Sequence, residues 1–350
     1  MEKTQLQGEQ SVKALATTVD EEDGRYLASM LDHNLSLQLT EGTLNDIAVD
    51  HLNQVEILIP FIHPYIGRAE IDAMPRLRLI ATRSTGYDHI DLAYATERGI
   101  AIANVPGYGE TAVAEHTFAL MLTLSRKIHL AYTRTQQGDY SLEGLRGFDL
   151  YGKTLGVVGA GAIGLHVIRI AKGFGMQVVA ADVMQNRLLS EVLGFRYVSL
   201  DELFASSDIV TLHAPALPST HHMVNRETLS KMKRGALLIN TARGSLVDTG
   251  ALAWALDTGL LGGAGLDALE GEEYLQHEEE LLSTSGTEEK LKLLVHNRLL
   301  QRRSNVVITP HIAFDSQEAL RRILDTTIEN IQAYLQGHPR NLVNPQTRPH

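Results

Sequence analysis

The chain has 350 residues, 44% of them hydrophobic, so it is long enough to form about two globular domains with ordinary cores. Its formal net charge is -11, which disfavours nucleic acid as a partner because the phosphate backbone would be repelled. The absence of cysteine excludes disulfides and thiolate zinc sites, and it fits a reducing compartment.

No segment of the sequence has the pattern of a targeting or membrane signal. The first twenty residues, MEKTQLQGEQSVKALATTVD, lack the apolar run of a signal peptide, and no later stretch reaches the ~18 apolar residues of a membrane span. We therefore expect a cytoplasmic protein without a membrane partner.

Short apolar runs alternate with more polar, helix-compatible segments up to about residue 105. The runs are residues 13–19, 55–62 and 77–84. This βα alternation predicts a parallel sheet. Residues 110–128 then predict one long helix that is apolar on most of its circumference, and we expect it to be buried between domains or subunits.

A second βα series predicts another mostly parallel sheet, covered on both faces. Its expected strands are residues 155–159, 177–182, 208–214, 236–240, 263–269 and 305–311. Residues 270–304 are a charged insertion that we expect to be a solvated loop with helical pieces. Residues 316–337 predict a closing amphipathic helix with Leu320, Leu324, Ile328, Ile331 and Leu335 on one face.

A glycine-rich phosphate loop opens this second series. Gly159, Gly161 and Gly164 form GxGxxG between a strand and an amphipathic helix, the context in which a dinucleotide pyrophosphate binds. The next strand ends in Asp182, near the position where a carboxylate accepts from the ribose hydroxyls. A carboxylate there would repel a 2′-phosphate, so we expect NAD and not NADP.

Three polar residues follow three of the later apolar strands, and the carboxyl ends of parallel strands line one crevice. Hydride exchange with a keto acid needs a proton donor and a cation for the anionic substrate. Histidine suits the first task and the planar fork of arginine the second, which predicts roles for His311 and Arg243. Glu272 would stabilise the imidazolium.

Each of these residues has a structural alternative. His311 could be a turn or core residue, Arg243 a surface ion pair, and Glu270 or Glu273 could replace Glu272 in its role. We expect no metal site at the adjacent His221 and His222, because neighbouring side chains point to different faces in most backbones.

Five stretches, VVGAGAIG, LHAPALPSTHHMVN, LLINTARGSLVD, GAGLDALEGE and VVITPHIAF, resemble those of the NAD-dependent D-2-hydroxyacid dehydrogenases over nearly the whole chain. The resemblance implies two Rossmann-like, doubly wound α/β domains: a flavodoxin-like catalytic domain from residues 1–110 and 316–350, and an NAD-binding Rossmann domain from residues 111–315. It also implies a homodimer, with the 110–128 helix at the hinge and dimer interface.

The resemblance further implies the residues of the site. The catalytic set would be Arg243, Glu272 and His311, and the following residues would line the cofactor: Gly159, Gly161, Ala162, Ile163, Gly164, Asp182, His213, Pro215, Thr241, Ala242, Asp267 and His311.

Three more stretches, RSTGYDHID, VPGYGETAVAEHT and TPHIAFDS, look most like the D-lactate dehydrogenase branch of the family. By that resemblance Thr85 and Gly86 would cradle the substrate carboxylate, and Tyr108 and Phe314 would lie near the substrate. The expected reaction is reversible reduction of a small 2-keto acid to a D-2-hydroxy acid. Phosphoglycerate, glyoxylate, phosphite or formate remain alternative substrates, and an NADH-sensing, corepressor-like interaction protein is the alternative without catalysis.

Overall fold

The computed structural model describes residues 11–31, 35–62, 65–276 and 287–344. The chain divides into two compact units, one made of residues 1–108 and 316–350 and the other of residues 109–315. The second unit is therefore continuous in sequence and is inserted between the two segments that form the first unit.

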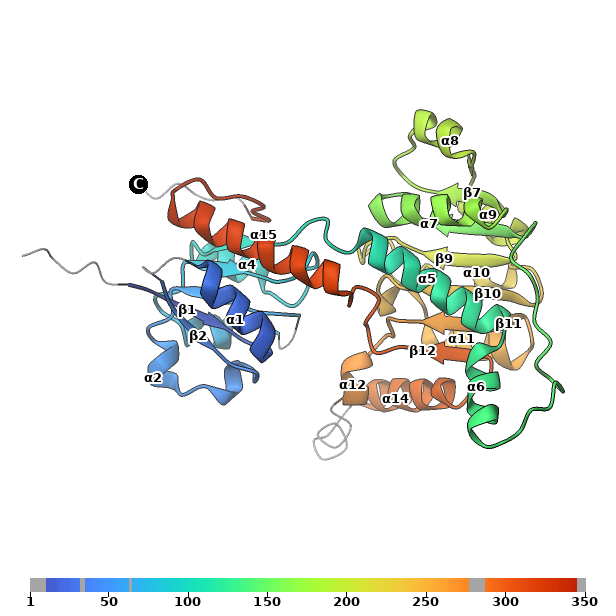
Figure 1. Cartoon of the computed structure of the whole chain (residues 1–350), viewed down its shortest axis with the longest axis horizontal. Helices are drawn as coiled ribbons and strands as arrows, with labels where there is room; N and C mark the ends of the chain where they lie inside the picture. Colours follow the sequence, from blue (N-terminus) through green and yellow to red (C-terminus); the bar gives the residue numbers. More distant parts are fainter. Residues whose placement is uncertain (1–10, 32–34, 63–64, 277–286, 345–350) are drawn as a thin grey trace, which may run out of the picture. The chain divides into compact units, whose positions relative to one another are not determined.

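The first unit is a five-stranded parallel sheet in the order β2-β1-β3-β4-β5, with helices on both faces (Figure 1). This is the flavodoxin-like order, in which a strand-order reversal follows the first strand. Its strands are β1 (Val12–Ala16), β2 (Leu35–Leu39), β3 (Ile57–Ile59), β4 (Leu79–Ala81) and β5 (Ala101–Ala103). Its helices are α1 (Glu21–Met30), η1 (Leu44–Asp46), α2 (Val49–Leu52), α3 (Arg68–Asp72), α4 (Leu92–Glu97) and α15 (Gln317–Leu335).

The predicted closing helix is α15, and it completes one face of the first sheet. The side chain of Ser316 caps it by accepting from the backbone N–H of Ala319. Its residues Leu324, Ile328 and Ile331 are buried in the same core cluster as the alternate side chains of β1, β3, β4 and β5. The other face packs against α2, α3 and α4.

The second unit is a seven-stranded parallel sheet in the order β12-β11-β10-β9-β6-β7-β8. Read from β8, this is the order 3-2-1-4-5-6 of a dinucleotide-binding sheet with one further strand, and the order reverses between β6 and β9. The strands are β6 (Thr154–Val158), β7 (Gln177–Ala181), β8 (Arg196–Tyr197), β9 (Ile209–Leu212), β10 (Ala236–Asn240), β11 (Leu261–Leu266) and β12 (Val306–Ile308).

Helices cover both faces of this sheet, as its nearly continuous apolar strands require. Figure 1 shows α5 and α7 on one face, where they share a core cluster with β6, β7 and β10. The opposite cluster includes side chains of α9, α10, α11 and α14. The helices are α5 (Glu110–Ser125), α6 (Ile128–Gln136), α7 (Ala162–Gly173), α8 (Arg187–Leu193), α9 (Leu200–Ser206), α10 (Arg226–Ser230), η2 (Gly244–Leu246), α11 (Thr249–Asp257), α12 (Glu272–Gln276) and α14 (Glu288–Gln301).

The predicted fold class, two doubly wound α/β sheets, is confirmed, and one local expectation needs correction. The single helix expected at 110–128 is two helices, because Lys127 adopts the left-handed φ of 53° between α5 and α6. Phe118 and Met121 of α5 are buried in a core cluster of the second unit, and the expected place of this helix at the hinge and dimer interface stays a prediction.

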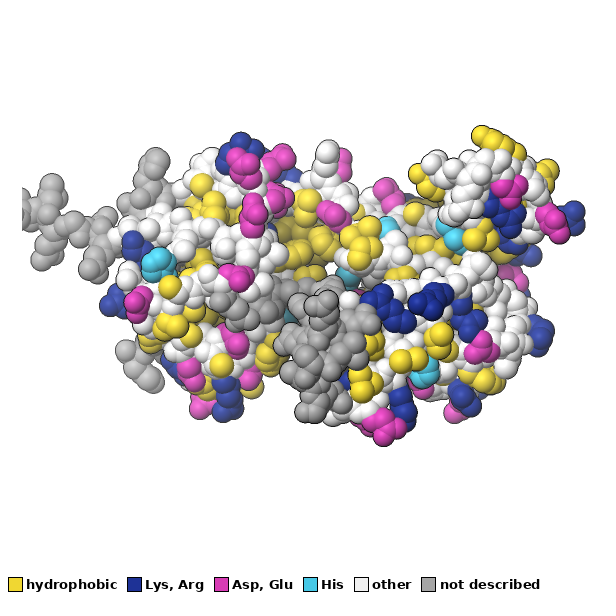
Figure 2. All heavy atoms as spheres, turned by 90° about the horizontal axis from the view of Figure 1, so that it is seen from below, with side chains coloured by type: hydrophobic (Ala, Val, Ile, Leu, Met, Phe, Trp, Pro, Cys, Tyr) yellow, Lys and Arg dark blue, Asp and Glu magenta, His cyan; other side chains and the backbone are white. Residues whose placement is uncertain are grey.

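The described part of the charged insertion at 270–304 contains two helices, α12 and α14, with short non-helical pieces at residues 270–271, 287 and 302–304. Acidic and basic side chains are interspersed on the described surface that Figure 2 shows. None of the helices in the described ranges is long and apolar enough to cross a bilayer.

Candidate active site

The glycine loop joins β6 to α7, and its three glycines meet different steric demands. Gly159 has a φ of 92°, and a Cβ there would lie 2.6 Å from the carbonyl oxygen of His213. A Cβ on Gly164 would lie 2.0 Å from the carbonyl oxygen of Gly159, so this glycine allows helix and loop to touch. A Cβ on Gly161 would meet no protein atom within 4 Å. Gly159 and Gly164 are thus required by close contacts within the protein backbone, whereas Gly161 leaves space for a ligand.

Asp182 follows β7 and braces this loop. Its Oδ2 accepts from the backbone N–H of Ala160 at 2.6 Å, and its Oδ1 accepts from that of Met184 at 2.7 Å. The carboxylate is partly exposed, and each oxygen keeps further acceptor capacity. Asp182 can therefore hold the loop and still accept from a ligand hydroxyl.

Arg243 lies in the turn between β10 and η2, with extended backbone. The turn is organised by Asn240, the fully buried last residue of β10. The Asn240 amide donates to the carbonyl of Arg243 at 2.9 Å and accepts from the N–H of Ala242 at 3.1 Å. The guanidinium Nη1 donates to the carbonyl of Ala242 at 2.9 Å. A permanent cation is thus presented, partly exposed, just beyond the strand.

His311 and Glu272 form a hydrogen-bonded pair beyond the ends of β12 and β11. The Nδ1 of His311 is 2.7 Å from Oε1 of Glu272. Burial alone would lower the pKa of His311, but the hydrogen bond and charge of Glu272, with the charge of Asp267, outweigh it. The pKa of His311 is therefore raised above its ordinary value, although the positive charge of Arg243 acts in the opposite direction.

The pair lines an open cavity of about 470 Å³, together with Leu269, Leu275 and Pro310. Of the three glutamates that the sequence left open, Glu272 contacts His311 and Glu270 contacts His222. The side chain of Glu273 lies outside the described ones.

Asp267 lies beneath the loop that carries His311, and its side chain is 1% exposed. Its Oδ1 accepts from the hydroxyl of Thr309 at 2.5 Å and from the N–H of Ile312 at 2.9 Å, while Oδ2 accepts from the N–H of Ala313 at 2.8 Å. Both oxygens are therefore turned into the protein. The expected cofactor-lining role of Asp267 stays a prediction.

The loop needs such support because His311 has a φ of 56°, in the left-handed region that is unfavourable for residues with a Cβ. The N–H of His311 donates to the carbonyl of Asp267 at 3.0 Å. Asp267 thus holds the strained loop through both its side chain and its backbone.

The remaining residues expected at the cofactor surround the same strand ends. His213 follows β9, its Nε2 is 2.9 Å from the hydroxyl of Thr211, and its buried Nδ1 has no hydrogen-bond partner among the described residues. Burial lowers the pKa of His213 to about 3, so the imidazole is neutral at pH 7. Thr241 is nearly buried against Thr117, with 2.9 Å between their hydroxyl oxygens. Ala162, Ile163, Pro215 and Ala242 are all at least partly exposed.

The residues expected at the substrate belong to different units. Thr85, Gly86 and Tyr108 lie in the first unit, and Phe314, like Arg243, lies in the second. Thr85 is exposed, and its hydroxyl donates to the carbonyl of Val105 at 2.7 Å.

The expectation for His221 and His222 was wrong in its geometry. Their rings are not on different faces but lie with centroids 3.9 Å apart. The cause is the left-handed φ of 49° at His222, which changes the direction of its side chain.

Sequence reasoning also missed the residues that support the site from within. Asn240, Thr117 and His116 were not among the predicted site residues. Asn240 hydrogen-bonds to the Arg243 turn, Thr117 to Thr241, and His116 to Thr309. The one usable signal was Asn240, a polar residue that ends an otherwise apolar strand.

The chain is similar to known proteins over most of its length. Residues 118–313 match the model of the D-isomer specific 2-hydroxyacid dehydrogenase, NAD binding domain. A 2-hydroxyacid dehydrogenase homolog of Haemophilus influenzae is 40% identical over 319 residues, which are 89% of this chain and 93% of that protein. The D-lactate dehydrogenase of Escherichia coli is 36% identical over 329 residues, 92% of this chain and 97% of that protein.

A solved structure gives the same result for the fold. The D-lactate dehydrogenase of Aquifex aeolicus, described as complexed with NAD and lactic acid, superposes with a TM-score of 0.85 at 37% identity. The match covers 95% of this chain and 99% of that one.

Proposed function

This chain belongs to the D-isomer-specific 2-hydroxyacid dehydrogenases, and we propose that its substrate is a small 2-keto acid of the pyruvate type, reduced to the D-2-hydroxy acid. As a member of that family it is an NAD-dependent enzyme that transfers hydride between 2-hydroxy and 2-keto acids. The substrate proposal rests on the similarity to D-lactate dehydrogenases, and the reaction is supported by a histidine with a raised pKa that is paired with a carboxylate.

The residues present fit NAD. The open space over Gly161 suits a pyrophosphate, and the orphaned Nδ1 of His213 offers a donor or acceptor that no described protein atom uses. When bound, NADH supplies the hydride that is transferred to the keto carbon. We assign to Asp182 the ribose hydroxyls, which it can bind with the acceptor capacity left by Ala160 and Met184.

His311 is the proposed proton donor to the substrate's keto oxygen. Because Nδ1 is engaged by Glu272, the proton that is transferred is the one on Nε2. The carboxylate of Glu272 stabilises the imidazolium, so the acid form persists to a higher pH than an ordinary histidine allows.

Arg243 is the proposed partner of the substrate carboxylate and keto oxygen, since its planar fork offers several donors to one anion. Thr85 and Gly86 are proposed to bind the same carboxylate through backbone N–H groups, and Tyr108 and Phe314 to bound the substrate side chain. Asp267 is assigned a positioning role, because both oxygens of its buried carboxylate accept hydrogen bonds from the loop that carries His311.

Steady-state NADH oxidation with a panel of keto acids tests the substrate proposal. We expect the highest kcat/KM with pyruvate, lower values with glyoxylate and phenylpyruvate, and a D product by chiral chromatography. Faster NAD⁺ reduction with phosphoglycerate, formate or phosphite would assign the chain to one of those substrates. Tight NADH binding with no turnover on any acid would favour the corepressor-like alternative.

A homodimer is the proposed assembly. Several large apolar side chains of α6 and the segment after it are exposed in the isolated chain, including Ile128 at 55%, Tyr132 at 65% and Leu142 at 85%. Such a group is typical of a surface that a second subunit covers. Light scattering after gel filtration should give twice the mass of the chain.

We also propose a cytoplasmic location, which fits a chain without cysteine.

A further inference from the structure

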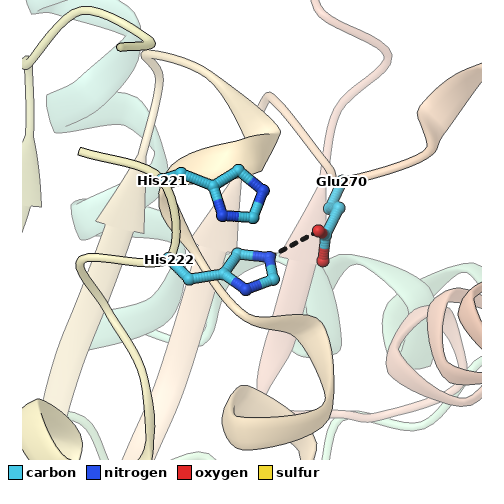
Figure 3. Close-up of side chains that lie close together, drawn as sticks. All are labelled: His221, His222 and Glu270. Atoms are coloured by element: carbon cyan, nitrogen blue, oxygen red, sulfur yellow. Dashed lines mark hydrogen bonds and ion pairs between the residues drawn. The ribbon is translucent and has the colours of Figure 1, made fainter. Parts of the chain in front are cut away.

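A cluster of three ligand-type side chains lies in the second unit outside the residues assigned to the reaction. It consists of His221, His222 and Glu270, and Figure 3 shows the three side chains pointing toward one another. One nitrogen of each histidine and one carboxylate oxygen all lie within 4.8 Å of one another. The two segments that supply them are about fifty positions apart in the sequence, so the fold brings them together.

The histidine segment is held in place by its own backbone. The N–H of His221 donates to the carbonyl of Leu217 at 3.0 Å, and that of His222 donates to the carbonyl of Ser245 at 2.9 Å. The side chain of Asn225 donates to the carbonyl of His222 at 3.0 Å. These contacts keep His222 in its left-handed conformation, so both imidazoles are presented on one side.

Glu270 is oriented from the opposite side. Its Oε1 is 2.5 Å from Nε2 of His222, and its Oε2 accepts from the hydroxyl of Thr249 at 3.1 Å. The side chain of Asn297 donates to its backbone carbonyl at 2.8 Å. A carboxylate with one oxygen bound by a hydroxyl and the other directed at imidazoles has the arrangement of a metal ligand with its outer support.

We propose that His221, His222 and Glu270 bind a transition-metal dication, with Zn²⁺ as its representative. Two imidazoles and one carboxylate suit Zn²⁺, Ni²⁺ or Cu²⁺, whereas Mg²⁺ and Ca²⁺ prefer oxygen ligands. Ligand atoms at about 2.0–2.2 Å from zinc in a tetrahedral site lie about 3.4 Å apart. The Nε2 of His222 and the Oε1 of Glu270, now 2.5 Å apart, must therefore separate by about 0.9 Å, and ligand atoms that are up to 4.8 Å apart must approach each other. His221 is exposed and its side chain is able to make that movement.

The bound cation cross-links the two segments that supply its ligands, and both are close to catalytic residues: the histidine segment is hydrogen-bonded to Ser245, and the other segment carries Glu270. Ser245 follows the Arg243 turn, and Glu270 precedes Glu272 by two residues. The site is therefore a clamp on the loops that carry the charged groups of the reaction. Three protein ligands leave the fourth tetrahedral position to water.

Isothermal titration of the tag-free, EDTA-treated and desalted chain with ZnCl₂ tests the proposal. We expect one tight Zn²⁺ per chain, and affinity about tenfold weaker or worse in His221→Gln, His222→Asn and Glu270→Gln, since even outer-shell losses cost about that much. Asparagine tolerates the left-handed backbone of position 222, and glutamine at 270 keeps hydrogen-bonding capacity. His338→Gln, a change at an exposed histidine of the first unit, should bind Zn²⁺ like the wild type.

Thermal melting of the same proteins is the second readout. Zn²⁺ at a hundredfold excess over its Kd should raise the melting temperature of the wild type and of His338→Gln, but not of the three cluster variants. Mg²⁺ should leave all of them unchanged. Absence of a tight stoichiometric site in the wild type overturns the proposal, as does undiminished affinity in His221→Gln, whose exposed side chain can be lost without unfolding the chain.

Discussion

Replacing Asp267 with asparagine tests whether this residue supports the catalytic loop or touches the cofactor. In the structure one oxygen accepts from Ile312 and Thr309 and the other from Ala313. Asparagine retains one acceptor, so in its least costly orientation the amide nitrogen faces the N–H of Ala313. Two donors then oppose each other at a position that is 1% exposed.

The cost follows from these contacts. A buried donor left without an acceptor costs about 1–3 kcal/mol, and loss of the charge weakens the remaining bonds by about 1 kcal/mol. We therefore expect the free energy of unfolding to fall by about 2–4 kcal/mol, which is roughly 4–16 °C in the melting temperature of a unit of this size. Because His311 is displaced with its loop, kcat/KM should fall by about 10- to 100-fold.

Calorimetry, NADH titration and steady-state kinetics on the same preparation measure these effects. The NADH Kd should change little, and Asp315→Asn, which removes the same charge from an exposed neighbouring residue, should behave like the wild type in all three assays. An unchanged melting temperature with clearly weaker NADH binding would refute the loop-supporting role and would indicate that Asp267 contacts the cofactor directly.

Four further changes test the proposed roles. His311→Ala should lower kcat for keto-acid reduction by about 10²–10⁴ while NADH affinity is kept, and near-normal turnover would exclude it as the proton donor. The reduction rate should fall as pH rises through the raised pKa of His311, and Glu272→Gln should move that fall to lower pH in a pH profile; an unmoved profile would contradict the pairing. Wild-type kcat/KM should clearly favour NADH over NADPH, and Asp182→Asn should narrow the difference, because the neutral side chain no longer repels a 2′-phosphate; equal efficiency in the wild type would count against this role. Arg243→Lys should cost about one to two decades in kcat/KM, and a loss of melting temperature with intact kcat/KM would indicate a structural ion pair instead.

The parts of the site that sequence could predict depend on topology and on local backbone. A GxGxxG loop between a strand and a helix, followed by a carboxylate at the end of the next strand, is typical of dinucleotide binding, and residues that follow successive parallel strands meet at one edge of the sheet. This is why Gly159, Arg243 and His311 could be chosen without coordinates.

The parts that could not be predicted depend on single backbone angles and on burial. The choice between Glu270 and Glu272 is made by Gly271, whose φ of 67° turns the chain between them. The close approach of the His221 and His222 rings likewise follows from the left-handed backbone of His222. The burial of Asp267 depends on the position of the loop that carries Thr309, Ile312 and Ala313, and no pattern near position 267 predicts it.

The return of α15 to the first sheet sets an order of events during synthesis. The core of that unit includes Leu324, Ile328 and Ile331, which leave the ribosome only after the whole second unit has been made. Until α15 is made, one apolar face of the five-stranded sheet is covered only in part, by α1, while the nucleotide-binding sheet, which is continuous in sequence, can complete its own core. Slow translation or early termination before residue 317 should consequently leave a folded second unit attached to an aggregation-prone first one, and pulse proteolysis of stalled nascent chains would reveal that asymmetry.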